Sequence, residues 1–226
     1  SPTIKECWFF DCGQAGVRCQ SGANPLIVDC LFQENEGGIE IQDSSPMVTR
    51  STMLLNRDAN GAGLHISGTS EPHVVNCVIV QNVATNMGGG FYVGVDAEPI
   101  FVNCTVADNV ASNAGGGFHN AGELHFWNAV LWGNAAPVGP GYHLLHSFES
   151  GYSCLQTLHL GGLNNIVSDP QFAGVGNYEL KSTSPCVDAG IDQQSGVHAP
   201  EDDRDGRDRI AAGGSGHSKY DMGAYE

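Results

Sequence analysis

The sequence predicts an all-β protein built as a single-stranded parallel β-helix. Three observations lead to this prediction: a segment that recurs six times, 31 glycines among 226 residues, and no long stretch with apolar residues at helical spacing. Glycine at about twice its average share, together with only 15% charged residues, is typical of short strands joined by many turns.

Each repeat begins with a short apolar segment that starts at proline in five copies. The six copies are "PTIKECWFFDC", "PLIVDCLFQEN", "PMVTRSTMLLN", "PHVVNCVIVQN", "PIFVNCTVADN" and "LHFWNAVLWGN". They end at Cys12, Asn35, Asn56, Asn82, Asn109 and Asn134, in steps of 23, 21, 26, 27 and 25 residues. A loop of variable length and a glycine-led strand follow, as in "GIEI" and "GLHI". This period, with alternating apolar positions, indicates the coils of a parallel β-helix.

Two rows of side chains are expected to stack inside the coils at a spacing of about 4.8 Å. The first row holds small residues: Cys7, Cys30, Ser51, Cys77, Cys104 and Ala129. The second, here called the ladder, holds Cys12, Asn35, Asn56, Asn82, Asn109 and Asn134. An asparagine amide can bond to the same amide one coil up, and asparagine tolerates a left-handed backbone, so we place these residues at a corner. The segments after the ladder, "RDANGA", "VATNM" and "VASNA", are predicted to be exposed loops that form the contact surface.

These coils resemble right-handed parallel β-helices of the pectate-lyase type. The "FQEN" at 32–35 and the recurring Gly-Gly-apolar element also resemble polymorphic outer-membrane protein repeats of bacterial surface proteins. The resemblance implies a pectin-lyase-like fold with about six regular coils over residues 1–146. A leucine-rich horseshoe has a similar period, but its leucine-rich consensus is absent.

After about residue 146 the repeat stops. The order of segments 169–172, 178–180, 184–190, 203–209 and 221–226 resembles the C-terminal part of bacterial secreted β-helix proteins. We predict that residues 147–226 form the final coil or coils and an irregular C-terminal cap, because an open β-helix end exposes strand edges. The resemblance implies an extracellular or cell-surface location. No signal peptide is seen and the chain starts within a repeat, so we expect a mature chain or a fragment.

The charge balance restricts the partners. The sequence contains nine Lys and Arg residues and 25 Asp and Glu residues, which gives a net charge of −16. Such a surface repels phosphate backbones and anionic membranes, so nucleic acid is not an expected partner. No apolar run approaches the ~20 residues of a membrane-spanning helix, so no transmembrane segment is predicted.

The cysteines are expected mainly as small packing residues. Bridges Cys7–Cys30 and Cys77–Cys104 are alternatives between neighbouring coils. Cys154 and Cys186 bracket the C-terminal segment, and Cys186 departs from the resembled pattern, so this pair is the favoured candidate for a disulfide. No CxxC motif or zinc-ligand spacing occurs.

The acidic stretch "EDDRDGRDR" contains the first half of a calcium-loop pattern, with Asp203 and Asp205 as candidate metal ligands. A complete EF-hand loop fails because its twelfth position is Gly214. The alternative is a turn in which Arg207 or Arg209 pairs with Asp221 or Glu226. No cofactor is predicted, and calcium is the one candidate.

No catalytic residue is predicted. The polygalacturonase signatures "NTDG", "GDD" and "GHG" are absent, and the strong bases of the coils are Lys5, Arg18, Arg50 and Arg57. Arg50 and Arg57 share one coil with Asp58, where a small site is conceivable. Histidines form no evident ligand set, so we expect surface or corner positions for them: His65, His119, His125, His143 and His146.

The sequence thus favours a cell-surface module with a structural, adhesive or glycan-contacting role, whose partners are glycans or other surface proteins. One alternative is a polysaccharide lyase or glycosidase fragment acting on acidic polysaccharide. Another is a filament subunit that stacks end to end through its first coil, burying Trp8 and Phe9. A groove with at least three charged side chains along one sheet face favours the enzyme, whereas a smooth Asn, Thr and Ser face favours adhesion.

Overall fold

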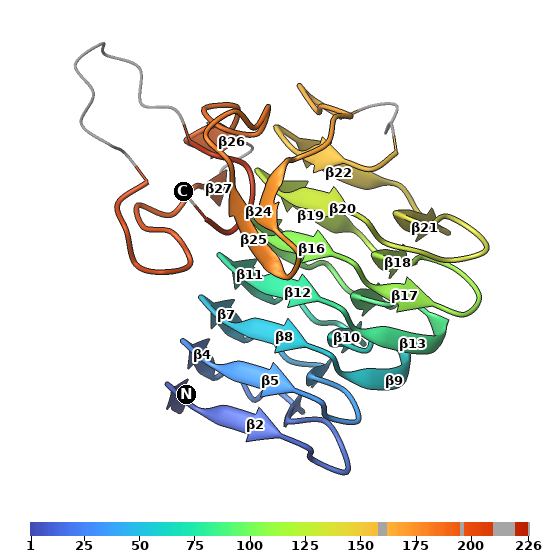
Figure 1. Cartoon of the computed structure of the whole chain (residues 1–226). Coiled ribbons are helices and arrows are strands. Elements are labelled where there is room, and N and C mark those ends of the chain that lie inside the picture. Colours follow the sequence, from blue (N-terminus) through green and yellow to red (C-terminus); the bar gives the residue numbers. More distant parts are fainter. Residues whose placement is uncertain (158–161, 195–196, 210–219, 226) are drawn as a thin grey trace.

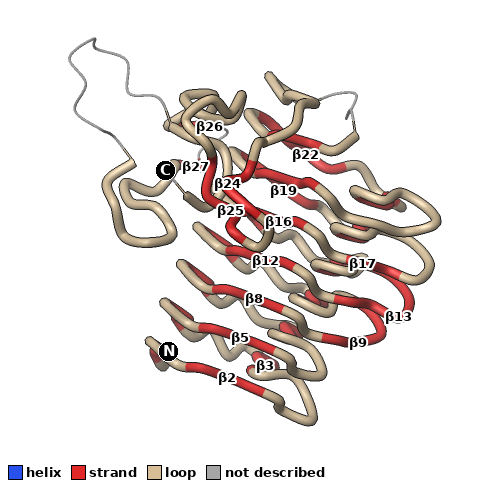
Figure 2. The backbone as a smooth tube through the Cα atoms, in the orientation of Figure 1, coloured by secondary structure: helices blue, strands red, loops and turns tan. Residues whose placement is uncertain are grey.

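The chain winds into stacked coils of parallel strands, which confirms the predicted all-β parallel β-helix (Figure 1). The computed structural model describes residues 1–157, 162–194, 197–209 and 220–225. Across these ranges the regular elements are strands, as Figure 2 shows, and no helix is long and apolar enough to span a membrane.

Three parallel sheets run the length of the coils. The first holds β1 (Thr3–Lys5), β4 (Leu26–Val28), β7 (Met47–Thr49), β11 (His73–Val75), β15 (Ile100–Val102), β19 (Leu124–Trp127) and β22 (Phe148–Gly151). The second holds β2 (Trp8–Phe10), β5 (Leu31–Gln33), β8 (Thr52–Leu54), β12 (Val78–Val80), β16 (Thr105–Ala107), β20 (Val130–Trp132) and β23 (Cys154–Leu155). The third holds β3 (Val17–Gln20), β6 (Ile39–Gln42), β10 (Leu64–Ser67), β14 (Phe91–Val93), β18 (Phe118–Asn120) and β21 (Tyr142–Leu144).

Each proline-led segment, expected as one strand, is divided into two by a left-handed corner. In the fourth and fifth coils the corner residues are Asn76 and Asn103, with φ of 53° and 50°. Asparagine adopts this backbone region more readily than most residues. The corner turns the next residue inward, so Cys77 and Cys104 are fully buried.

The ladder asparagines hydrogen-bond from coil to coil. The side-chain Nδ2 of Asn56 donates to Asn82 Oδ1 at 2.9 Å, and that of Asn82 donates to Asn109 Oδ1 at 3.0 Å. Each Oδ1 also accepts the backbone N–H of the preceding ladder residue, including the N–H of Cys12 at the first coil. Gln156 extends the ladder beyond Asn134, whose backbone N–H it accepts at 2.8 Å.

The expectation that the ladder asparagines themselves are left-handed is wrong. The residue before each takes that conformation, such as Leu55 with φ of 58° and Gln81 with φ of 57°. This arrangement turns the exposed Leu55 outward and the next amide inward, where buried amides require internal partners.

The three segments predicted to be loops after the ladder form a fourth parallel sheet, here called the fin. It consists of β9 (Arg57–Asn60), β13 (Val83–Met87) and β17 (Val110–Ala111). Asn86 donates to Asn60 at 3.0 Å, and Asn113 donates to Asn86 at 3.3 Å. In-register neighbours on three coils supply partners for these backbones, and the corresponding segment after Asn35 is too short to join them.

Glycine lies next to the ladder because the coils approach closely there. A Cβ atom on Gly90 would lie 2.5 Å from the carbonyl oxygen of Gly117 and 3.0 Å from Asn109 Nδ2. The backbone of Gly90 is not left-handed. Glycine is needed at this position because a side chain would not fit.

We therefore expect Gly90→Ala to lower the free energy of unfolding by about 2 kcal/mol, in the range of overpacked cores. Urea unfolding followed by circular dichroism measures this change. Gly174→Ala serves as the control because nothing lies within 4 Å of a Cβ at that position. Equal unfolding midpoints for the two variants would contradict the close-approach explanation.

Beyond the coils, the C-terminal segment runs along the side of the β-helix. Residues 163 and 166 make isolated parallel bridges to β22 and β23. Residues 169–194, 197–209 and 220–225, here called the strap, include the hairpin of β24 (Phe172–Gly174) and β25 (Asn177–Leu180) and the short pair β26 (Gln193–Gln194) and β27 (Val197–His198). Tyr178 and Ala224 pack on Val78 and Val80, so the strap covers the outer face of the second sheet (Figure 1).

The corner asparagines hold this strap. Asn76 Nδ2 donates to the carbonyl of Asp202 at 2.7 Å, Asn103 Nδ2 to that of Asp221 at 3.1 Å, and Asn128 Nδ2 to that of Ile191 at 2.6 Å. The asparagines that form the corners therefore also bind the strap through their side-chain amides.

Candidate ligand groove

The outer face of the third sheet carries one row of polar and aromatic side chains in register. Strand pairing aligns Arg18, Glu40, His65, Tyr92, His119 and His143, one from each of six coils. Neighbouring rings lie about one coil apart: the ring centroids of His65 and Tyr92 are 5.0 Å apart, and those of Tyr92 and His119 are 5.1 Å apart. Each residue stands two positions after a strand-leading glycine, and aligning the last glycine of each run would have revealed the row.

A groove of about 460 Å³ lies at the N-terminal end of this row, beside the fin. Its lining includes Arg18, Glu36, Glu40, Asp58, Asn60 and His65. The fin begins only at the third coil, so the first two coils leave a space beneath β9. The volume falls within the range of small-ligand sites.

The charges in the groove are uneven. Arg18 Nε donates to Glu40 Oε2 at 2.7 Å, which pairs the groove's guanidinium with a carboxylate of the next coil. Asp58 Oδ1 accepts the backbone N–H of Ala59, and its Oδ2 lies close to Gly37. Within the described ranges, neither Glu36 nor Asp58 forms a salt bridge.

The hydrogen bonding of His65 fixes its tautomer. Its Nδ1 lies 3.0 Å from the carbonyl oxygen of Asn60, which can only accept, so Nδ1 carries the proton. The Nε2 of the neutral ring is therefore an acceptor. Together with three carboxylates, this makes the groove rich in acceptors.

At the other end of the row, His119 and His143 lie within hydrogen-bond distance of each other. Their Nδ1 atoms are 3.0 Å apart, while the ring centroids are 5.0 Å apart and the planes differ by 22°, so the two nitrogens face each other. This distance is typical of an N–H···N hydrogen bond. His119 is 1% exposed, and its Nε2 has no hydrogen-bond partner in the described structure.

Burial, and to a smaller extent the neighbouring His143, lowers the pKa of His119. The folded protein therefore favours neutral His119, and its contribution to stability is fully present above the unfolded pKa of about 6.5. We expect this contribution to decrease as the pH falls from about 6.5 toward the folded pKa, by about 1.4 kcal/mol per unit of pKa difference.

The measurement compares urea midpoints at about pH 7.5 and about pH 5.5 for the wild type and His119→Phe, which keeps an aromatic ring but cannot titrate. The variant should lose less stability on acidification than the wild type. An identical loss in both proteins would show that His119 does not titrate in this range.

Asp203 and Asp205 lie in a turn of the strap. Asp203 is fully buried, and its Oδ1 accepts the backbone N–H groups of Asp205 and Arg207 at 2.8 Å each. In the part of the chain that the structure describes, no three His, Cys, Asp or Glu side chains gather in a metal-holding group. Calcium binding stays an untested prediction. The fully buried Arg209 donates to Asn76 Oδ1 and to the carbonyls of Gly223 and Ala224, whereas Arg207 reaches Glu179 at 3.7 Å.

The candidate disulfide between Cys154 and Cys186 is not formed, and both residues are free thiols. The two side chains are nevertheless brought together between β23 and the strap, where Met222 and Val130 surround them. The hydrogen bond with Cys154 and, to a smaller extent, burial raise the pKa of Cys186. Cys77 and Cys104 also form no disulfide. Both are free thiols, and both are fully buried. Thiols of this row hydrogen-bond to backbone carbonyls of the same or the preceding coil, as Cys104 does to Val74 at 3.3 Å.

Several other groupings suggested by the sequence are separated by the fold. Arg50 lies under the strap, paired with Asp29 and Asp202 at 2.8 Å each, whereas Arg57 stands on the fin. Of the two aromatic residues named for end-to-end contacts, Phe9 stacks on Phe32 in the interior. Trp8 is 63% exposed on the outer side of the second sheet, and end-to-end assembly stays untested.

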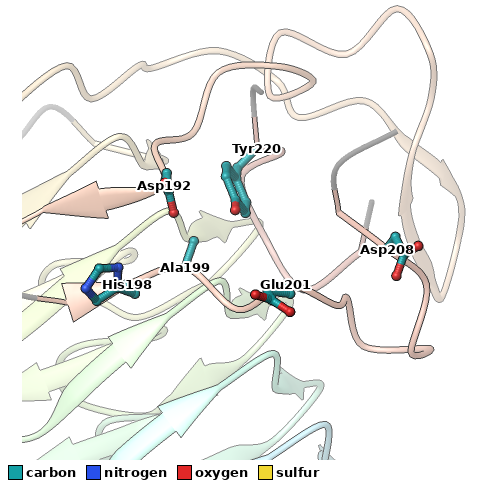
Figure 3. Close-up of a pocket in the computed structure, with 6 residues that line it drawn as sticks. All are labelled: Asp192, His198, Ala199, Glu201, Asp208 and Tyr220. Carbon is teal, nitrogen blue, oxygen red and sulfur yellow. The ribbon is translucent and has the colours of Figure 1, made fainter. Parts of the chain in front are cut away.

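A second pocket, of about 550 Å³, lies within the strap. Figure 3 shows Asp192, Ala199 and Tyr220 on one side, Asp208 on the opposite side, and Glu201 between. Residues 195–196 and 210–219 lie outside the described ranges and are close in sequence to the residues that line this pocket. The groove beside the fin is therefore the candidate site.

The stacked parallel coils and their lateral groove define a β-helix protein. A family profile described as right handed beta helix region matches residues 1–134, more than half of the chain, and the protein therefore belongs to this family. No curated protein and no solved structure matches the chain.

Proposed function

We propose that this protein is an extracellular β-helix module that binds a glycan chain along the outer face of its third sheet. The observation that supports this most directly is the in-register row from Arg18 to His143, with its groove beside the fin. The row repeats at the coil spacing, so it offers side chains of differing type at regular intervals to a polymer that is itself repetitive. The rings of His65 and Tyr92, which stack on each other, and the polar groups of Arg18 and Glu40 are suited to the CH groups and hydroxyls of sugars.

Glycan binding is tested by titrating the protein with a panel of defined oligosaccharides and measuring heat or fluorescence. Tyr92→Ala should weaken binding about tenfold, because it removes an aromatic ring and a hydroxyl from the middle of the row. His73→Ala provides a control on the outer side of the first sheet, where the residue is exposed. Absence of binding to every glycan, or equal affinity of the two variants, would contradict the proposal.

A second candidate function is glycan cleavage by the same groove. Glu36, Glu40 and Asp58 come from two neighbouring coils and line one cavity, where two carboxylates can serve as acid and base, although they lie in a loop, on the third sheet and on the fin and not along one sheet face. Incubation with uronate and neutral polymers, followed by detection of unsaturated products and new reducing ends, tests this function. Turnover that is lost in Asp58→Asn would establish an enzyme, and binding without turnover would leave a binding module.

A further inference from the structure

We infer that the groove beside the fin selects a glycan that carries free amino groups, such as an oligomer of glucosamine, over uronate polymers. This inference rests on the proposed glycan-binding function and specifies its ligand. It also differs from the acidic polysaccharide that the pectate-lyase resemblance suggested.

The charge of the groove supports a cationic ligand. Three carboxylates, Glu36, Glu40 and Asp58, line the groove together with a single guanidinium, that of Arg18. Arg18 is bonded to Glu40, so the carboxylates of Glu36 and Asp58 provide the uncompensated charge. A uronate would bring a further negative charge to each sugar, and the net charge of −16 adds repulsion at longer range.

The fin brings Asp58 to the coil that carries Glu36. The Oδ2 of Asp58 would lie 3.1 Å from a Cβ atom on Gly37, the residue after Glu36, and both carboxylates line the groove. His65 adds an acceptor nitrogen, because its Nδ1–H is already donated to Asn60. An ammonium group has one positive charge and three hydrogen-bond donors, and it therefore complements these acceptors better than a hydroxyl does.

The test compares three oligomers of equal length by calorimetry: glucosamine, N-acetylglucosamine and galacturonate. We expect glucosamine to bind at least about tenfold more tightly than its N-acetylated form, and galacturonate to bind most weakly. Because the preference is electrostatic, the difference between the first two should shrink as salt is raised.

Variants locate the interaction. The double variant Glu36→Gln and Asp58→Asn should weaken glucosamine binding about threefold to tenfold and N-acetylglucosamine binding by a smaller factor. Asp96→Asn is the matched control, since Asp96 is an exposed carboxylate outside the groove. Circular dichroism verifies that each variant is folded.

The outcomes distinguish the two proposals. Equal affinity for the glucosamine and N-acetylglucosamine oligomers would overturn the amine preference while supporting glycan binding. Tight binding of galacturonate would also overturn it. Lack of binding to all three, with none in the wider glycan panel, would overturn the proposed function itself. Calcium or magnesium ions that displace glucosamine at micromolar concentration would indicate a cation site in place of a glycan site.

Discussion

Asn82→Ala is expected to lower the free energy of unfolding by about 3–5 kcal/mol. In the folded protein, Asn82 Oδ1 accepts the backbone N–H and the Nδ2 of Asn56, and its own Nδ2 donates to the carbonyl of Met53 and to Asn109 Oδ1. Alanine removes the acceptor of the Asn56 backbone N–H, one of the two acceptors of Asn56 Nδ2, which keeps its bond to the carbonyl of Phe32, and the side-chain donor to the carbonyl of Met53. Each unsatisfied buried group costs about 1–3 kcal/mol, so the total is large for one amide.

Urea unfolding monitored by circular dichroism measures this loss. Asn113→Ala is the matched control, because Asn113 is exposed at the fin and donates one side-chain bond of 3.3 Å to Asn86. We expect the control to change stability by less than about 0.5 kcal/mol, as surface substitutions usually do. Similar losses in the two variants would show that burial of the ladder amide has no special energetic weight.

Arg209→Met is expected to release the strap at a cost of about 3–5 kcal/mol, the range for breaking a buried charged network. Arg209 is fully buried. Its guanidinium donates to Asn76 Oδ1 at 2.8 Å and to the carbonyls of Asp202, Gly223 and Ala224 at 3.0–3.1 Å. It therefore joins a corner of the fourth coil to two separate segments of the strap, and methionine has similar length but no donors.

Hydrogen exchange and limited proteolysis follow the strap separately from the coils. In the variant we expect faster exchange at residues 220–225 and earlier cleavage within 169–209, while the central coils keep their protection. Arg207→Met in the same turn is the control, because the side chain of Arg207 is 61% exposed and its ion pairs are at 3.5 Å or more. Equal exchange in the two variants would contradict a role for Arg209 as the anchor of the strap.

The sequence was sufficient for the coils because periodicity reports stacking directly. Residues such as Asn56 and Asn82 recur at one position of the repeat, and identical groups one coil apart must meet if the repeat is a coil. The left-handed corners were missed because the residues that occupy them vary, from Glu6 and Asp29 to Arg50 and Asn76. The corners share a backbone conformation and not a residue type, so the sequence pattern does not reveal them.

The site was less accessible to sequence reasoning than the fold. His65, Tyr92 and His119 form a row that alignment of the strand-leading glycines would have shown, but their types differ from coil to coil, so no repeated residue type indicated it. Asp58 reaches the groove because the fin is a sheet, whereas the sequence indicated a loop of variable length. The sequence suggested a calcium loop at residues 203–209. In the structure, Asp203 stabilises a turn and Arg209 anchors the strap.

The sequence by itself determined the repeat, the coil architecture and the identity of the buried ladder, because each depends on contacts between equivalent positions of neighbouring coils. Tertiary structure alone decided the path of the strap, the contacts of Arg209 and the collection of Glu36, Asp58 and His65 in one groove. Those contacts join positions that are not equivalent in the repeat or, for Asn76 and Arg209, lie 133 residues apart. No local pattern encodes such pairs, and their geometry follows from the shape that the coils and the strap adopt together.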